Sequence, residues 1–263
     1  MPHPLRSARP TDPFLRLRCE DPDLEVYAVD GDHGVLLRTG RTSGEMWVTA
    51  LGDDPARILA LIDSLRVHRF DGVTVHDHVF EHLPDDIRGP DPGHWSLWEY
   101  TGDRPPAECA RTGPVSGPSG SATAHTVREV VRLDPRDPRI DVLLQHSSSA
   151  YIHAGDPSVV EWLGIVEGSA LRAVGARVRA AYGSAHLVSI CTDPAHRGRG
   201  LGRAVTTALV GSALDAGAPR VWLEMYADNA AGAVAYRAVG FTEQGRYRSA
   251  ATRSLRSHGS DAF

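Results

Sequence analysis

The chain has 263 residues, a hydrophobic fraction of 41% and a formal net charge of −5 at pH 7. This length leaves room for one large domain or two small ones around a substantial apolar core. The negative charge argues against nucleic acid as the main partner. No apolar run approaches the ~20 residues that a membrane span requires, so we expect no contact with a membrane.

The first third of the chain predicts an arm followed by a small α/β unit. Residues 1–17 are rich in Pro and Arg and lack the apolar core of a secretory signal, so we expect a loosely held arm on a cytoplasmic protein. A helix is expected to open at Asp53-Asp54-Pro55. Apolar, β-branched runs predict strands at residues 24–29, 34–38, 46–51, 72–76 and 94–100.

Three histidines in this unit suggest a metal site at first sight: His76, His78 and His82. Their spacing matches no common ligand pattern, and no cysteine or carboxylate pair completes a set, so we predict no metal. The three cysteines, Cys19, Cys109 and Cys191, form no motif with one another, which fits a reducing cytoplasm.

The composition divides the chain into an N-terminal α/β domain over residues 1–102, a linker over 103–124 and a second domain over 125–263. The linker prediction depends on a stretch of Pro, Gly, Ser and Ala without core-forming residues. The second domain is expected to contain a strand at 127–133, a helical segment that follows Asp137-Pro138 and runs through Leu144, a hairpin of 159–166 and 170–178, and a central strand at 187–192.

A glycine-rich turn, Arg197-Gly198-Arg199-Gly200-Leu201-Gly202-Arg203, joins the central strand to a predicted helix. Glycines allow the backbone to approach a ligand, and the free amides at a helix start attract phosphate. A P-loop requires lysine, which the sequence lacks, and the dinucleotide fingerprint would require glycine at Arg203. The pattern that fits is Arg-x-x-Gly-x-Gly.

A second strand and helix follow the turn. Alternation over Val221–Tyr226 places Trp222 and Glu224 on one face of the strand. Asn229 is a suitable N-cap for a helix that ends near Gly240, and Tyr236 lies two turns into that helix.

Residues 187–241 resemble the GNAT superfamily of N-acetyltransferases. The glycine-rich turn is similar to the acetyl-CoA pyrophosphate loop of that superfamily, and Asn229, Tyr236 and Gly240-Phe241 are similar to its second signature. Within it, Trp222-Leu223-Glu224 and Asn229-Ala230-Ala231 look like the ribosomal-protein alanine N-acetyltransferase family. The resemblance implies an α/β GNAT acyltransferase fold, with a mixed central sheet and helices on both faces. The smaller α/β domain before it is either unrelated or a degenerate GNAT-like half.

The resemblance also implies acetyl-CoA as the acyl donor. The residues expected to bind it are Ile190, Cys191, Thr192, Arg197, Gly198, Arg199, Gly200, Leu201, Gly202, Arg203 and Asn229.

Acetyl transfer to an amine requires a base for the ammonium and an acid for the departing thiolate. The resemblance assigns the base to Glu224, acting through water, and the acid to Tyr236. His186, at the start of the central strand, is the second candidate for the base. Cys191 is interpreted as a small buried residue, because direct transfer requires no covalent intermediate on the enzyme.

We therefore expect an N-acetyltransferase, monomeric or homodimeric, whose acceptor is a primary amine of a small molecule, an amino acid or a protein N-terminus. A catalytically silent acyl-CoA sensor and an acyltransferase for longer acyl chains are the alternatives. The N-terminal domain is expected to bind no CoA and to form one wall of the acceptor cleft. One strand is expected at 243–251, but the aromatic and acidic residues typical of the alanine acetyltransferases are absent after Phe241, which leaves the acceptor open.

Overall fold

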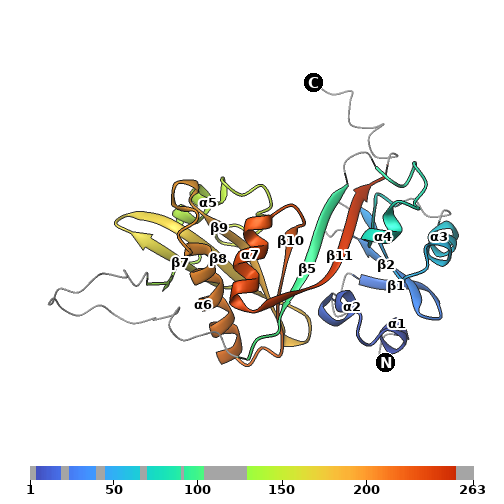
Figure 1. Cartoon of the computed structure of the whole chain (residues 1–263), viewed down its shortest axis with the longest axis horizontal. Helices are drawn as coiled ribbons and strands as arrows, with labels where there is room; N and C mark the ends of the chain where they lie inside the picture. Colours follow the sequence, from blue (N-terminus) through green and yellow to red (C-terminus); the bar gives the residue numbers. More distant parts are fainter. Residues whose placement is uncertain are drawn as a thin grey trace, which may run out of the picture. The chain divides into compact units, whose positions relative to one another are not determined.

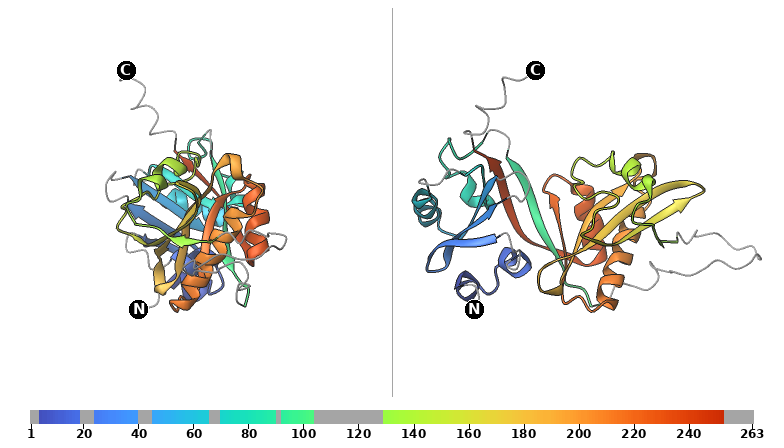
Figure 2. Two further views of the ribbon diagram at one scale, coloured as in Figure 1. Left: turned by 90° about the vertical axis from the view of Figure 1, so that its left-hand side faces the viewer. Right: turned by 180° about the vertical axis from the view of Figure 1, so that it is seen from behind.

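The computed structural model describes residues 4–18, 24–39, 45–65, 70–89, 92–103 and 129–252 (Figures 1 and 2). These residues form two compact units. Unit 1 takes its described residues from 1–97, 225–228 and 243–263, and unit 2 takes them from 98–224 and 229–242. Three strands have residues in both units: β5 (Gly93–Tyr100), β10 (Val221–Tyr226) and β11 (Phe241–Ala251). The predicted linker, except residue 103, lies outside the described residues.

In unit 2 the strands lie in the order β10-β9-β8-β7-β6, and only the pair β9 and β10 is parallel. Helix α5 covers one face of this sheet, and α6 with α7 covers the other (Figure 1). This arrangement confirms the predicted mixed sheet with helices on both faces. Besides β10, the elements of unit 2 are β6 (Val131–Arg132), α5 (Pro138–Leu144), β7 (Val159–Glu167), β8 (Ala170–Arg179), η2 (Ala181–Gly183), β9 (Ala185–Thr192), η3 (Pro194–His196), α6 (Leu201–Asp215) and α7 (Ala230–Val239).

A buried carboxylate holds α6 against the sheet. Glu161 on β7 accepts hydrogen bonds from Arg177 of β8 at 2.6 Å and from Ser212 of α6 at 2.5 Å. Arg132 of β6 donates a third bond at 2.6 Å. The Glu161 side chain is only 1% exposed, and a buried charge is tolerated when it is paired and hydrogen-bonded in this way. Glu161 therefore fixes the C-terminal half of α6 relative to three strands.

Unit 1 repeats the strand–helix pattern of unit 2. Strands β1, β2 and β3 are antiparallel neighbours, and β3 is parallel to β4 with α3 between them in the chain. In unit 2, β7, β8 and β9 are antiparallel neighbours, and β9 is parallel to β10 with α6 between them. This correspondence favours the interpretation of unit 1 as a degenerate GNAT-like half. Its elements are α1 (Pro4–Ala8), α2 (Pro13–Arg18), β1 (Leu24–Asp30), β2 (His33–Thr39), β3 (Met46–Leu51), α3 (Pro55–Ser64), β4 (Gly72–His76) and α4 (Asp77–Phe80).

β11, the last strand among the described residues, joins the sheet of unit 1. β11 pairs antiparallel with β4, from Tyr247 opposite His76 to Ala251 opposite Gly72. The fully buried Tyr247 ring stacks on His76 at 4.9 Å and on Trp95 at 4.7 Å between ring centroids. The strand predicted at 243–251 is thus confirmed, and unit 1 depends on it.

The predicted loose arm is wrong for the described residues 4–17. They form α1 and part of α2, and four apolar side chains are buried: Leu5, Phe14, Leu15 and Leu17. Asp12 caps α2, because its Oδ1 accepts the Leu15 N–H at 3.1 Å, and its Oδ2 accepts the Arg9 guanidinium at 3.1 Å. The Pro- and Arg-rich composition concealed a short amphipathic pattern.

The strand predicted at 127–133 is shorter in the structure, where β6 spans Val131–Arg132. Residues 127 and 128 lie outside the described residues. None of the helices in the described ranges is long and apolar enough to cross a membrane.

Candidate functional site

The predicted site residues gather where β9 and β10 stop pairing. The parallel pairs run from Val221 opposite Ala185 to Leu223 opposite Leu187. Strand β9 then continues to Thr192, and within the described part of the chain its last residues have no recorded partner on β10. Backbone N–H and C=O groups that are not paired with a neighbouring strand can form hydrogen bonds to a ligand instead.

A bulge in β9 lies beside this point. Val188 pairs with Ala176 and Cys191 with Val174, so two residues of β9, Ser189 and Ile190, lie opposite the single residue between those partners on β8. Ser189 has φ of 51°, a left-handed conformation that is uncommon for residues other than glycine. Such bulges leave a residue outside the ladder and redirect the backbone, and the predicted donor-binding residues Ile190–Thr192 begin within this bulge.

Gly175 is the β8 residue opposite the bulge, and α6 packs directly over it. A Cβ atom there would lie 2.9 Å from Leu209 Cδ1, 3.1 Å from Ile190 Cγ1 and 3.2 Å from Val205 Cγ1. Sequence reasoning missed both Ser189 and Gly175. A glycine inside a strand is a known signal for a bulge or a close approach, whereas a serine carries no comparable signal.

The turn between β9 and α6 has the conformation that its glycines allow. Gly198 and Gly200 have φ of 73° and 76°. Gly200 is the N-cap of α6, and among the residues that the structure describes no side chain caps that end. The amides of the first turn of a 15-residue helix are therefore free to bind an anion, which the helix dipole favours. Arg199 and Arg203 are exposed beside them.

An ion-pair network holds the turn just before these glycines. Asp193 Oδ2 lies 2.8 Å from Arg172 Nη1 and 2.9 Å from His196 Nδ1. Its Oδ1 accepts the Ala195 N–H at 3.0 Å and so caps η3. The hydrogen bond from the Ala195 N–H lowers the pKa of Asp193, and the interactions with Arg172 and His196 lower it further. The carboxylate thus stays charged and fixes the path of the chain into the loop.

The corresponding helix of unit 1 has the opposite chemistry at its start. Asp54 caps α3, and its Oδ1 accepts the N–H groups of Ala56 at 2.9 Å and Arg57 at 3.4 Å. Pro55 occupies the first helical position and has no N–H to offer. A second carboxylate, Asp53, precedes the cap. The N-terminus of α3 is closed by its own acidic side chain, whereas that of α6 is open.

The predicted cofactor-binding residues differ in what their side chains do. The Arg197 guanidinium donates to the carbonyl of Thr192 at 3.3 Å and to that of His146 at 3.4 Å. Asn229 caps α7 by accepting the Gly232 N–H at 2.9 Å. Leu201 is buried, so only its backbone can reach a ligand.

Cys191 is 4% exposed, and its Sγ donates to the Leu143 carbonyl at 3.4 Å. Burial raises the pKa of the Cys191 thiol, which makes it a poor nucleophile and fits the interpretation of a small core residue. Cys19 and Cys109 lie outside the described residues.

Glu224 is the first β10 residue beyond the last β9 pair. It shares a strand face with Trp222, whose ring stacks on His186 at 3.7 Å with an angle of 5° between the planes. Val188, two residues after His186, belongs to the core beside α5. His186 shares a face with Val188 and therefore also faces α5, as does the Trp222 ring that stacks on it. Glu224 follows Trp222 by two residues and lies on this same α5 face of the sheet. His186 lies beside Trp222 within the paired part of the strands.

Tyr236 approaches from the opposite face. It lies on α7, which packs against α6, and its ring contacts Phe241 edge-on at 6.0 Å between centroids. The residue is 8% exposed, and burial raises the pKa of Tyr236 to about 12. Tyr236 is consequently protonated at neutral pH. Side chains on opposite faces of a sheet can meet one substrate only where the strands are not paired, and pairing of β9 with β10 ends beside Glu224.

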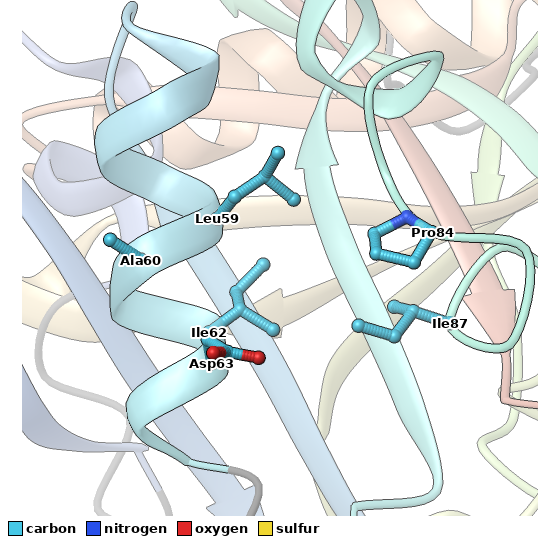
Figure 3. A pocket seen from close by; sticks show the side chains of 6 residues that line it. All are labelled: Leu59, Ala60, Ile62, Asp63, Pro84 and Ile87. Atoms are coloured by element: carbon cyan, nitrogen blue, oxygen red, sulfur yellow. The ribbon is translucent and has the colours of Figure 1, made fainter.

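Unit 1 has a cluster of aromatic and histidine rings and a small groove. His76 stacks on His78 at 5.7 Å and on Tyr247, and within the described ranges no group of three or more His, Cys, Asp or Glu residues could hold a metal ion. A groove of about 210 Å³ lies between α3 and the segment after α4. Leu59 and Ile62 point toward Pro84 and Ile87 across it (Figure 3). It is smaller than typical ligand pockets of ~300–1,000 Å³, and no predicted site residue lines it.

Comparison with known proteins finds a family match in the second half of the chain. Residues 124–241 match the model of the Acetyltransferase (GNAT) family. A GCN5-related N-acetyltransferase from Kribbella flavida superposes with a TM-score of 0.50 and 16% identity, covering 95% of this chain and 94% of that one. A GCN5-related N-acetyltransferase-like protein from Streptococcus suis gives 0.52 and 11%, covering 94% and 98%. At these identities the two structures establish the shared fold. No curated protein matches the chain.

Proposed function

Because residues 124–241 of this chain are a GNAT acetyltransferase domain, we propose that the protein transfers the acetyl group of acetyl-CoA directly to a primary amine. The family domain makes the chain an acyltransferase that uses an acyl-CoA. The choice of acetyl rather than a longer acyl group, and of an amine as acceptor, is our proposal. The resemblance of Trp222-Leu223-Glu224 and Asn229-Ala230-Ala231 to the alanine acetyltransferases supports both choices.

The observation that carries the proposal is the open N-terminus of α6. Its cap is Gly200 at φ of 76°, without a capping side chain, and Arg199 and Arg203 add positive charge around it. The diphosphate of a CoA is an anion of the kind that such a helix end binds. Asp54 closes the equivalent end in α3 with a carboxylate, which repels phosphate. We therefore place the CoA site in unit 2 and none in residues 20–102.

The remaining donor contacts belong to β9 and α7. Amides of Ile190–Thr192 would hold the arm of the acyl-CoA and the oxygen of the thioester carbonyl, where preorganised N–H donors favour transfer. Asn229, at the start of α7, would contact the CoA through its amide. Bound acetyl-CoA supplies an activated acyl group, and the protein supplies position and proton transfer.

Glu224 and Tyr236 would move the two protons. Glu224 would accept the proton of the acceptor ammonium through a water molecule, so that the neutral amine attacks the carbonyl. Tyr236 would donate its phenolic proton to the departing sulfur. Burial of Tyr236 raises its pKa, which keeps the proton on the hydroxyl until the sulfur departs. His186 is less suited to the role of base, because its ring is stacked face to face on Trp222.

Calorimetry with acetyl-CoA tests the binding site. Gly200→Ala places a Cβ atom in open space, since the nearest atom would be Arg203 Nη2 at 3.9 Å. The variant therefore perturbs mainly a backbone conformation that disfavours alanine, at a cost of about 1–2 kcal/mol. If that strain opens the turn, the affinity for acetyl-CoA should fall by about 5- to 30-fold. Gly211→Ala, on the same helix with nothing within 4 Å, is the matched control and should keep the wild-type affinity.

A panel of amines assayed for release of free CoA tests the reaction. Small amines, amino acids and peptides with free N-termini should be compared with acetyl-CoA and with longer acyl-CoAs. Tight binding without turnover of any amine would instead indicate a silent acyl-CoA sensor. Faster turnover of a longer acyl-CoA would contradict the choice of acetyl.

A further inference from the structure

The chain between α5 and β7 is fastened to β9 by side chains of the bulge. Ser189 Oγ donates to the carbonyl of Ile152 at 2.8 Å. Cys191 Sγ donates to the carbonyl of Leu143, in the last helical turn of α5, at 3.4 Å. Both donors flank Ile190, so the segment from 143 to 152 lies directly beside the amides that we assign to the acyl donor.

A third bond reaches the same segment from the glycine-rich loop. Arg197 donates to the carbonyl of His146 at 3.4 Å while its Nε donates to the carbonyl of Thr192. Residues 145–152 form neither a helix nor a strand. Their position is set in part by these side chains of β9 and the loop, because turns without a ladder depend on such bonds.

Ser189 differs from the other two donors in its backbone. Its φ of 51° is the conformation that creates the bulge, and its hydroxyl holds the neighbouring segment. Strained residues of this kind persist when the surrounding structure requires them, and they cluster at functional sites. Ser189 therefore joins the shape of the donor strand to the position of residues 145–152.

We propose that Ser189 is a positioning residue for acyl transfer: its hydroxyl holds residues 145–152 beside the thioester, where they form part of the surface that the acceptor meets. The proposal depends on the proposed function of unit 2. The segment exposes polar and aromatic groups suited to contact a polar acceptor, including His146 and Tyr151, the latter 60% exposed. Loss of the tether should disturb the acceptor and leave the donor in place.

Ser189→Gly is the decisive variant, because glycine adopts positive φ freely, so the hydroxymethyl group is removed while the backbone conformation is kept. One hydrogen bond of this kind changes an equilibrium by about 2- to 12-fold. We expect amide hydrogen exchange in 145–152 to accelerate by about that factor and the KM for the amine to rise similarly. The Kd for acetyl-CoA and the kcat should stay within about 3-fold of the wild-type values. This change is smaller than the average effect of losing one hydrogen bond.

Two further variants separate the tether from other effects. Ser189→Ala removes the hydroxyl and also disfavours the bulge, so it should weaken acetyl-CoA binding as well. Ser64→Gly removes a hydroxyl that donates to the carbonyl of Leu61 in unit 1 and should change neither the exchange of residues 145–152 nor the KM for the amine.

The proposal is overturned if Ser189→Gly leaves the exchange of residues 145–152 at the wild-type rate. It is equally overturned if the affinities for acetyl-CoA and amine fall together. Hydrogen exchange and calorimetry need no turnover. A wild-type protein that acetylates no amine would therefore refute the proposed function, while the exchange comparison would still report on the tether.

Discussion

Replacing Tyr236 by phenylalanine probes both the burial and the chemistry of one hydroxyl. The residue is 8% exposed and its ring packs against Phe241. Phenylalanine keeps that packing and removes only the group that ionises. Burial raises the pKa of Tyr236 from 10.0 to about 12, so the variant should change how stability depends on alkaline pH.

The size and sign of this change follow from the pKa. Below pH 10 both the native and the unfolded tyrosine are protonated, and the stabilising contribution is fully present. As the pH rises toward 12, the unfolded chain ionises while the native phenol resists, so stability is lost. One pKa unit corresponds to about 1.4 kcal/mol. The wild type should lose about 1.4 kcal/mol relative to Tyr236→Phe by pH 11, and roughly 2–3 kcal/mol by pH 12.

The measurement is urea unfolding of both proteins at pH 8, 10 and 11, with the difference in free energy of unfolding taken at each pH. Other ionisations affect both proteins alike and cancel. Tyr27→Phe replaces an exposed tyrosine of β1 and is the control. If the difference in free energy of unfolding between wild type and Tyr236→Phe does not vary with pH, the Tyr236 hydroxyl is solvated in the native protein.

The same variant tests the proposed acid. At pH 8, kcat should fall by ~10²–10⁴, the usual contribution of a general acid, while acetyl-CoA affinity stays within a few-fold. The rate of CoA release at saturating substrate concentrations gives kcat, and calorimetry gives the affinity for acetyl-CoA. A variant that turns over at the wild-type rate would make Tyr236 structural, and another donor or water would carry the proton to sulfur.

The other variants test the base, the loop and the packing of α6. Glu224→Gln should flatten the acidic limb of the pH profile of kcat/KM, because this limb reports the free enzyme's base. A second acceptor amine with a different pKa, assayed in parallel, separates the ionisation of the amine from that of the enzyme. An unchanged acidic limb would exclude Glu224 as the base. Gly202→Val places a Cβ atom 3.2 Å from Thr192 Oγ1, so calorimetry should show at least ~10-fold weaker acetyl-CoA binding; unchanged affinity would refute the phosphate-loop assignment. Gly175→Ala should cost about 1–3 kcal/mol in urea unfolding, because its Cβ would overlap Leu209; an unchanged midpoint would show that α6 shifts without penalty.

Local patterns predicted elements of both units, including β10, which carries Glu224. The strands Met46–Leu51 and Val221–Tyr226 and the helix Pro138–Leu144 have the bounds that their sequences indicate. Each is an apolar run closed by turn or cap residues, such as Asp137 before Pro138, so the signal lies within the element. The open glycine turn before α6 is encoded in the same local way.

Features that depend on distant partners were not predictable in this way. No local pattern pairs β11 with β4, and none marks a serine for positive φ, because Ser189 takes its conformation from its neighbours on β8 and from Ile152. The helices at the N-terminus were missed since Pro and Arg dominate their composition, although Asp12 and Pro13 form a cap and first-turn pair that sequence reasoning can use. The position of His186 at the start of β9 made it a candidate base. Its stacking on Trp222 could not be predicted, because it depends on the register in which β9 pairs with β10.

The pairing of β11 with β4 sets an order of events during translation. About 170 residues separate His76 from its partner Tyr247, which at ~5–20 residues per second amounts to roughly 10–30 s on the ribosome. Throughout that interval β4 presents unpaired N–H and C=O groups, the kind of edge that pairs with other chains. The N-terminal unit is synthesised first, yet it completes its sheet last. A nascent chain stalled before residue 241 should therefore be protease-sensitive in unit 1 and a client for chaperones that shield strand edges.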